Sequence, residues 1–139
     1  MKPQVLRQIA SFAALLLSTG LPSCDREINP KSEMQIQTGP AHVTELGGTI
    51  NSFVVVFNEL GNKPIEEYGV VYTFDDNVKD RYPDLTDSQV AFDLPPQRYS
   101  NEKPVKIEFP SSAHWIGYRA YAKLKSGEIK YAEPVIITY

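Results

Sequence analysis

Apolar and polar positions alternate most regularly in residues 118–124, near the end of the chain. One face of this stretch carries the apolar side chains of Tyr118, Ala120, Ala122 and Leu124. A period of two predicts a half-buried β-strand. Residues 125–128 contain a glycine turn, and residues 129–139 form a second run rich in Val, Ile and Tyr. Together they predict a β-hairpin with one apolar face, which needs another sheet over that face.

Further strand-like runs precede the hairpin and are separated by turn residues. They cover residues 35–37, 41–46, 49–57, 67–74 and 105–109. We expect Gly39-Pro40 to end the first run, and Gly69 to mark close packing or a bulge. In the third run one face carries Phe53, Val55 and Phe57, and the other carries mainly Ile50, Val54 and Val56. The runs predict an all-β chain of about seven strands, folded as a two-sheet sandwich.

The composition of the 139 residues is ordinary for one soluble domain, with 42% apolar and 22% charged residues. The formal net charge is −3. Only two charges, both positive, precede Cys24, so the chain from Cys24 onward has twelve basic and seventeen acidic residues, a net charge of −5. This negative charge argues against nucleic acid or anionic lipid as a partner.

Residues 1–23 are predicted to be a targeting segment outside the fold. Lys2 and Arg7 supply a basic start, and residues 9–17 supply an apolar run. That run is shorter than the roughly 20 residues that a membrane-spanning helix needs. Small residues then lead to Cys24, the single cysteine, which cannot form a disulfide within the chain.

The sequence Leu21-Pro22-Ser23-Cys24 resembles the lipobox of bacterial lipoproteins, with Pro22 in place of the usual small residue. The resemblance implies that the signal peptide, residues 1–23, is removed and that the Cys24 thiol is acylated, as in a palmitoylated lipoprotein. The membrane would then be a partner through this lipid. The alternatives are an ordinary secretory signal with an incidental cysteine, or a cytosolic N-terminus.

Asp25-Arg26-Glu27 resembles in part the surface-export signal of Bacteroidetes lipoproteins. It implies a lipid anchor in the bacterial outer membrane with the domain exposed at the cell surface, while the periplasmic face remains possible in principle. In enteric bacteria an Asp beside the cysteine resembles an inner-membrane retention signal instead. Residues 24–34 are interpreted as a tether.

Several stretches of the domain resemble the fibronectin type III-like modules of Bacteroidetes surface lipoproteins. They are Glu67-Tyr68-Gly69-Val70-Val71-Tyr72, Tyr118-Arg119-Ala120-Tyr121-Ala122-Lys123, Ser126-Gly127-Glu128 and the run from Tyr131 to Thr138. The resemblance implies an immunoglobulin/fibronectin type III-like two-sheet sandwich over residues 35–139. Two positions depart from it. In this fold a tyrosine at the corner before a strand hydrogen-bonds the backbone through its hydroxyl. That position falls near Ile116 here, so we expect this hydrogen bond to be missing. Ala132 stands where the family has a glycine.

Residues 75–103 are too long for a simple connection and are predicted to be an insertion, with an edge strand near residues 89–92. The insertion contains the oxygen-bearing side chains of Asp75, Asn77, Asp80 and Asp84. They do not fit a calcium loop, because Lys79 stands at a ligand position and Asp80 where a glycine is required. We therefore expect a solvated turn there.

Three aromatic residues are candidates for ligand binding: Tyr82, Tyr99 and Trp115. Rigid amphipathic rings suit a platform for a glycan or for a protein partner. The alternative for Trp115 is a core position at one end of the sandwich. The alternative for the two tyrosines is packing of the insertion onto the sheet.

Candidate catalytic and metal-binding groups are few. His42 and His114 have no partner at the spacing of metal ligands, and no phosphate loop or nucleophile motif occurs. Glu66 and Glu67 are adjacent, so in a regular strand they would point to opposite faces. We expect no enzyme, no metal and no cofactor. A hydrolase would need an acidic pair facing a cleft.

Two hypotheses for the function follow. The first is a lipid-anchored, non-catalytic binding or scaffold module at the cell envelope, which engages a glycan or a protein through the 75–103 insertion and nearby loops. The second is a structural accessory subunit that docks on an outer-membrane complex by strand addition at a sheet edge.

Overall fold

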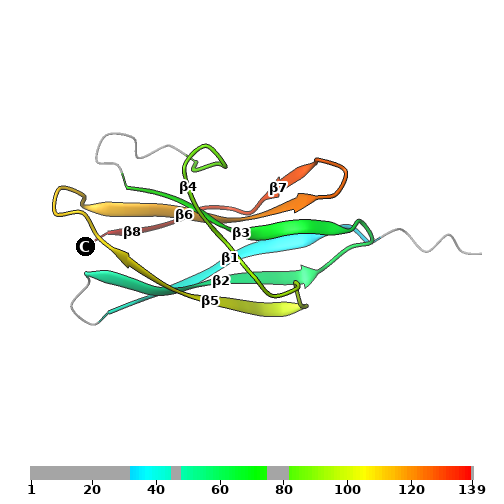
Figure 1. Ribbon diagram of the computed structural model, residues 1–139, viewed down its shortest axis with the longest axis horizontal. Helices are drawn as coiled ribbons and strands as arrows, with labels where there is room; N and C mark the ends of the chain where they lie inside the picture. Colours follow the sequence, from blue (N-terminus) through cyan, green and yellow to red (C-terminus); the bar gives the residue numbers. More distant parts are fainter. Residues whose placement is uncertain (1–31, 45–47, 75–81, 139) are drawn as a thin grey trace, which may run out of the picture.

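The structure is a computed structural model that describes residues 32–44, 48–74 and 82–138. These residues form two antiparallel sheets that pack face to face (Figure 1). The eight strands are β1 (Gln35–Val43), β2 (Thr49–Glu59), β3 (Ile65–Phe74), β4 (Ser88–Ala91), β5 (Tyr99–Glu108), β6 (Trp115–Leu124), β7 (Ile129–Tyr131) and β8 (Val135–Thr138). The predicted all-β, two-sheet sandwich is confirmed. In the described ranges, no helix has the length and apolarity to cross a membrane.

Sheet A has the strand order β1-β2-β5, and sheet B has the order β4-β3-β6-β7, with β8 also paired to β6. The predicted C-terminal hairpin is confirmed, but its second half is divided into two strands. β7 pairs with residues 121–123 of β6, and β8 pairs with residues 115–118. This division adds one strand. The predicted runs 35–37 and 41–46 join into the single strand β1, and with the edge strand β4 the count is eight.

A threonine from sheet A fills the gap between β7 and β8. The Thr38 hydroxyl accepts a hydrogen bond from the Ala120 amide at 2.9 Å and donates one to the Glu133 carbonyl at 2.6 Å. Both backbone groups are thereby satisfied where the regular ladder is interrupted. Thr38 thus joins β1 of sheet A to sheet B at the point between β7 and β8.

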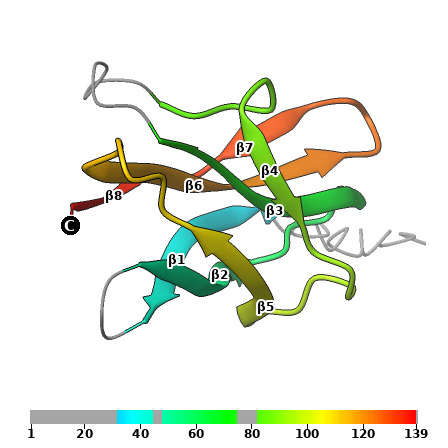
Figure 2. The same ribbon diagram turned by 60° about the vertical axis from the view of Figure 1, so that its left-hand side comes forward.

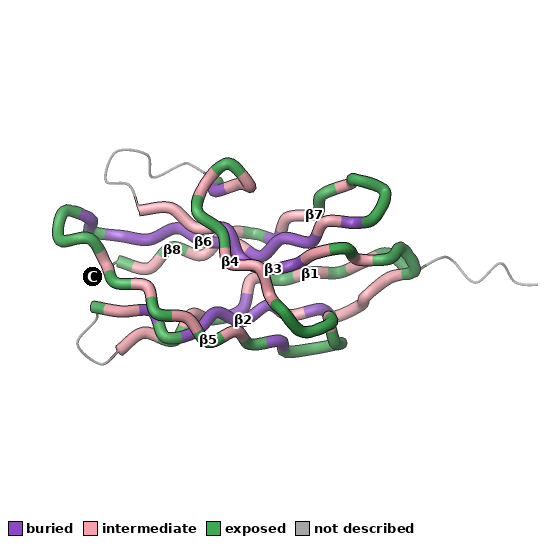
Figure 3. Tube along the Cα trace, in the orientation of Figure 1, coloured by how far each residue is buried: buried purple, intermediate pink, exposed green. Residues whose placement is uncertain are grey.

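The core lies between the sheets, where the inner faces are buried (Figure 3). It contains Ile50, Phe53, Val55, Phe57, Tyr68, Val70, Ile116, Tyr118, Ala120, Ala122 and Ala132. The alternation predicted for residues 118–124 is confirmed, because Tyr118, Ala120 and Ala122 face this core. Aromatic rings link the sheets, with centroid distances of 5.2 Å for Phe53–Tyr118 and 5.4 Å for Phe57–Tyr68.

β-Bulges change which side chains face the core. A register shift between Ile50 and Ser52 reverses the alternation, so Ile50 joins Phe53 on the inner face rather than the outer face predicted for it. Gly39-Pro40 does not end the first strand: β1 continues through a second irregularity there. Gly69 shows the close packing predicted for it, since a Cβ there would lie 2.0 Å from the Val90 carbonyl oxygen of β4.

The Tyr118 hydroxyl ties the irregular part of β1 to sheet B. It accepts a hydrogen bond from the Ala41 amide at 3.0 Å and donates to the Gly39 carbonyl at 3.3 Å. A tyrosine hydroxyl is therefore tied to the backbone, but it belongs to Tyr118, two residues after Ile116.

The predicted 75–103 insertion contains regular structure. The edge strand predicted near residues 89–92 is confirmed as β4, which lies beside β3 at the edge of sheet B (Figure 2). Residues 99–103 belong to β5 and pair with β2. The described connecting segments are thus residues 82–87, which include Tyr82, and residues 92–98.

Candidate functional site

The loop of residues 82–87 is fastened to the outer face of sheet B through Arg119. The Arg119 guanidinium lies over the Tyr131 ring, 4.0 Å from its centroid, and 5.6 Å from that of Tyr82. Its Nε–H donates to the Pro83 carbonyl, and the Tyr131 hydroxyl accepts a hydrogen bond from the Leu85 amide at 3.1 Å. Tyr82 is 57% exposed. It is therefore packed on the sheet and accessible at the same time.

Trp115 is buried rather than displayed. It is 5% exposed, and a Cβ added at Gly117 would lie 3.1 Å from its ring. Among the described residues its indole N–H has no hydrogen-bond partner. Val71, Tyr121 and Pro83 are also buried without belonging to the core between the sheets. The proposal of Trp115 as part of an exposed platform is thus corrected: burial leaves its ring no accessible face.

Tyr99 lies on the other sheet. It begins β5, where it pairs with Phe57 of β2, and it is 62% exposed. Its φ of 74° is unusual for a bulky residue. Since Tyr82 lies over β6 of sheet B, the structure does not bring the three predicted aromatics into one platform. It leaves two exposed tyrosines on different sheets.

The loop of residues 92–98 separates two hollows. The larger has a volume of about 440 Å³ and lies between the loop and the edge of sheet B; among its lining residues are Ile65, Phe92, Leu94, Pro95, Pro96 and Lys123. The smaller, of about 240 Å³, lies on the β5 side of the same loop. Leu94 is 73% exposed, the largest value among the exposed large apolar residues described. We refer to the larger hollow as the Leu94 groove.

Buried Asn101 holds this loop in place. Its amide group donates to the Gln97 carbonyl at 2.8 Å, and its side-chain oxygen accepts from the Gln97 amide at 2.8 Å. The Tyr68 hydroxyl donates to the Leu94 carbonyl at 2.8 Å, and burial raises its pKa. The loop is thus fixed by side chains from both sheets, which makes the Leu94 groove a preformed feature. The sequence predicted neither contact: Asn101 belongs to no motif, and Tyr68 was identified only as part of a strand.

Three carboxylates line the Leu94 groove: Glu66, Glu67 and Asp93. Glu66 and Glu67 do not point to opposite faces as predicted. A register shift between Ile65 and Glu67 makes an irregularity at Glu66, and both side chains meet the same face of β6. Tyr121 donates to Glu67 at 2.7 Å, and Lys123 lies 3.4 Å from Glu66.

An acidic pair therefore does face a hollow, which was the requirement set for a hydrolase. Each carboxylate, however, is engaged by a structural partner. Asp93 forms an ion pair with Lys103 across the loop. Burial and the hydrogen bond to Glu67 raise the pKa of Tyr121. The arrangement joins neighbouring strands.

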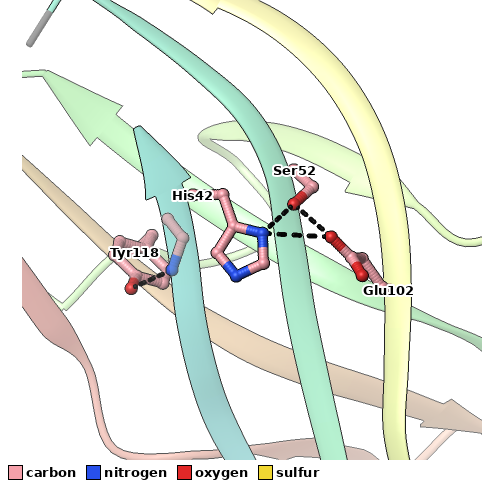
Figure 4. A network of polar contacts seen from close by, with 5 residues as sticks. His42, Ser52, Glu102 and Tyr118 are labelled. Carbon is pink, nitrogen blue, oxygen red and sulfur yellow. Dashed lines mark hydrogen bonds and ion pairs between the residues drawn. The ribbon is translucent and has the colours of Figure 1, made fainter. Parts of the chain in front are cut away.

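A second polar cluster lies on the outer face of sheet A (Figure 4). The Ser52 hydroxyl donates to Glu102 at 2.6 Å, and His42 Nδ1 lies 3.0 Å from Ser52 Oγ and 3.2 Å from Glu102 Oε1. Serine and carboxylate both meet the same ring nitrogen, whereas a catalytic triad uses two. Ser52 is also buried. The cluster therefore links β1, β2 and β5. Sequence analysis missed it because the contacts depend on strand register.

Metal ligation has no support in the described part of the chain. No group of three or more His, Cys, Asp or Glu side chains there could hold a metal ion. Asp84 accepts hydrogen bonds from the Thr86 amide and hydroxyl at 2.8 and 2.6 Å, as in a solvated turn. Asp75, Asn77 and Asp80 lie outside the described residues, as does Cys24.

Comparison with known proteins gives no relative: the chain matches no protein-family model, no curated protein and no solved structure.

Proposed function

We propose that this protein is a non-catalytic binding or scaffold module, anchored at the bacterial cell envelope through an acylated Cys24. The partner would be a glycan or a protein, and no nucleic acid. The anchor is supported by the basic start, the short apolar run and the Leu-Pro-Ser-Cys sequence at its end. The acidic residues after Cys24 support a location in the outer membrane with the domain displayed at the cell surface. The periplasmic face is the other possible orientation.

The sandwich is proposed to be of the immunoglobulin/fibronectin type III kind. The support is the arrangement of a three-stranded sheet, β1-β2-β5, against a sheet in which β3 and β6 are central. Folds of this kind present loops at both ends of a rigid frame and host many binding functions. The fold alone therefore does not select the partner.

The observation that carries the binding proposal is the Leu94 groove. An exposed leucine followed by two prolines borders a hollow of about 440 Å³. The prolines restrict the backbone, and Asn101 fixes the loop from below, so little ordering is needed on binding. Tyr82 adds a second accessible apolar side chain, on the outer face of sheet B.

Strand addition is the weaker candidate. The edge strand β1 is interrupted by an irregularity at Gly39-Pro40, and the other sheet edges are poorly suited to pairing. The edge strand β5 carries Pro104 and alternating charges at Lys103, Lys106 and Glu108, and charges and proline discourage edge pairing. The edge strands β4 and β8 have only four residues each. The carboxylates of the groove likewise favour a structural role over hydrolysis.

Binding is tested with the full mature protein on glycan arrays and in pull-downs from envelope extracts. Leu94→Ser and Tyr82→Ala should each weaken a specific interaction by about tenfold, as expected for a contact worth roughly 1.4 kcal/mol. The matched control is Ile136→Ala, which removes another exposed apolar side chain, on β8. Equal loss in the control, or binding that survives both changes, would remove the Leu94 groove and Tyr82 from the function.

The anchor is tested separately. Mass spectrometry of the mature N-terminus should find an acylated Cys24 as the first residue, and Cys24→Ser should release the protein from membranes. A mature chain that begins elsewhere and carries no lipid would reject the anchored display.

A further inference from the structure

The end of the sandwich at which Ser32 lies gathers three segments (Figure 1). They are the β2–β3 loop, the β6–β7 turn and the start of β5. Ser32, Lys63 and Lys130 line one pocket of about 200 Å³. The side chain of Arg98 donates to the Asn58 carbonyl at 2.9 Å and pairs with Glu59 at 2.6 Å. These contacts place the three segments beside the point where the predicted tether enters the domain.

The charge at this end is opposite in sign to that of the remaining chain. It carries the cations Lys63, Arg98, Lys125 and Lys130 and the carboxylates Glu33, Glu59 and Glu128, a net charge of +1. The other described residues carry four cations and eight carboxylates, a net charge of −4. The net charge of the chain from Cys24 onward, which argued against anionic lipid, therefore does not represent this surface.

The lysines at the pocket share one carboxylate. Glu128 lies 2.8 Å from the Lys63 ammonium and 3.1 Å from that of Lys130. The Lys63 and Lys130 ammonium groups hold the pKa of the Glu128 carboxyl below its usual range. Lys125, in the adjoining turn, is exposed and forms no ion pair with another described residue. Positive charge therefore remains available at this end.

Apolar groups accompany these cations. Tyr99 projects with an exposed ring from a backbone position that bulky residues rarely adopt, and Asn101 donates to its carbonyl at 3.1 Å. The Arg98 guanidinium lies 5.2 Å from the centre of the Tyr99 ring. Ile129, at the start of β7, is exposed as well. Tyrosines and cations side by side are typical of residues that meet the membrane–water interface.

We propose that this end, the tether-end surface formed by Lys63, Arg98, Tyr99, Lys125, Ile129 and Lys130, docks on an anionic lipid surface. The inference rests on the proposed acylation of Cys24. Eight residue steps separate Cys24 from Ser32, and a fully extended chain of that length spans at most about 28 Å. An anchored domain therefore keeps this end close to the headgroups. Docking assigns Tyr99 to the lipid and leaves Tyr82 and the Leu94 groove to a partner.

The test uses the acylated full-length mature protein in vesicles with anionic lipid, in zwitterionic vesicles and in detergent. The lysine side chains are labelled with an amine-reactive reagent, and mass spectrometry measures the labelling rate of each lysine. In anionic vesicles Lys63 and Lys125 should react several-fold more slowly than in detergent, while Lys106 of β5 keeps its rate. Raising the salt from about 0.1 M to about 1 M shortens the screening length from roughly 10 Å to 3 Å and should remove the difference.

Two variants sharpen the test. Lys125→Glu should restore the labelling of Lys63 toward its rate in detergent, and the matched change Lys106→Glu should not. Unchanged labelling of Lys63 in anionic vesicles, equal protection of Lys106, or equal protection in zwitterionic vesicles would each overturn the inference. Acylated protein that floats with vesicles but shows no protection rejects the docking alone. Protein without acyl chains rejects the anchor, and the docking with it.

Discussion

Two buried regions flank sheet B and differ in origin. The inner region lies between the sheets and is built from alternating positions of β2, β3 and β6. The outer region lies on the opposite face of sheet B, where Trp115 and Tyr121 of β6 are buried, as is Pro83 of the 82–87 loop. The inner region is apolar and continuous. The outer one is fastened by the Arg119 guanidinium between two tyrosine rings.

The difference shows how one strand can be covered on both faces by different means. An apolar face opposite another sheet is covered by the fold itself. The face of β6 that carries Arg119 and Lys123 reads as solvent-exposed in sequence, yet a loop from the middle of the chain packs there. We expect substitutions in the inner region to have larger effects on the free energy of unfolding than substitutions in the outer region.

The largest effect is expected for Phe53→Ala in the inner region. Phe53 is fully buried and its ring contacts those of Tyr72 and Tyr118. Truncation should lower the free energy of unfolding by about 3–5 kcal/mol, measured by urea denaturation. The control Leu94→Ala, at an exposed position, should change it by no more than about 0.5 kcal/mol. Similar effects for both would contradict the assigned core.

Alkaline pH should act on both regions. Burial raises the pKa of Tyr68, Tyr118 and Tyr121. Above the unfolded value of about 10, the unfolded chain loses protons that the folded chain keeps. The stability from these groups is complete below about pH 10 and falls as the pH rises, by about 1.4 kcal/mol per pH unit for each tyrosine. Urea denaturation at stepped pH measures this slope.

Single phenylalanine variants then separate the regions. Tyr118→Phe, in the inner region, and Tyr121→Phe, in the outer region, should each reduce the alkaline slope by the share of one tyrosine. The control Leu94→Ala, which removes no titratable group, should leave it unchanged. A slope that Tyr121→Phe does not alter would mean that the outer region opens before global unfolding.

A smaller and local effect is expected for Arg119→Met. The change removes the stacking on Tyr131 and the hydrogen bond to the Pro83 carbonyl, together worth about 1–2 kcal/mol. Hydrogen exchange should accelerate at the Leu85 amide, which donates to Tyr131, and remain slow in β2. Lys123→Met, four residues further along the same face of β6, serves as the control. Faster exchange throughout the sandwich would show that the two regions unfold as one unit.

The smallest effect is expected for Trp115→Phe. The change loses apolar area but also removes a buried N–H that has no acceptor among the described residues, and such a group costs about 1–3 kcal/mol. The two contributions oppose each other, so the free energy of unfolding should change by less than about 1 kcal/mol. A large loss in thermal and urea unfolding would indicate a stabilising contact of the indole N–H.

The sequence was sufficient for the sandwich, the hairpin and the inner face, because alternation reports which side chains point to one face. It was insufficient at the bulges. The shifts beside Ile50 and Glu66 depend on how two strands meet, and each moves a side chain to the other face. The outer region and the Leu94 groove were missed for a related reason. The outer region depends on Arg119, which reaches the carbonyl of Pro83 in a loop distant in sequence. The Leu94 groove depends on the loop conformation that Asn101 and Tyr68 hold, and alternation does not report it.

The hydroxyl of Thr38 has a consequence for how copies of this domain can associate. It occupies the break in the final ladder, and Pro134 follows beside it without an N–H to offer. An incoming chain would find hydrogen-bonding partners for only a few residues before meeting this stop. The side of the sandwich between β1 and the last strands is therefore a poor template for strand pairing with another copy.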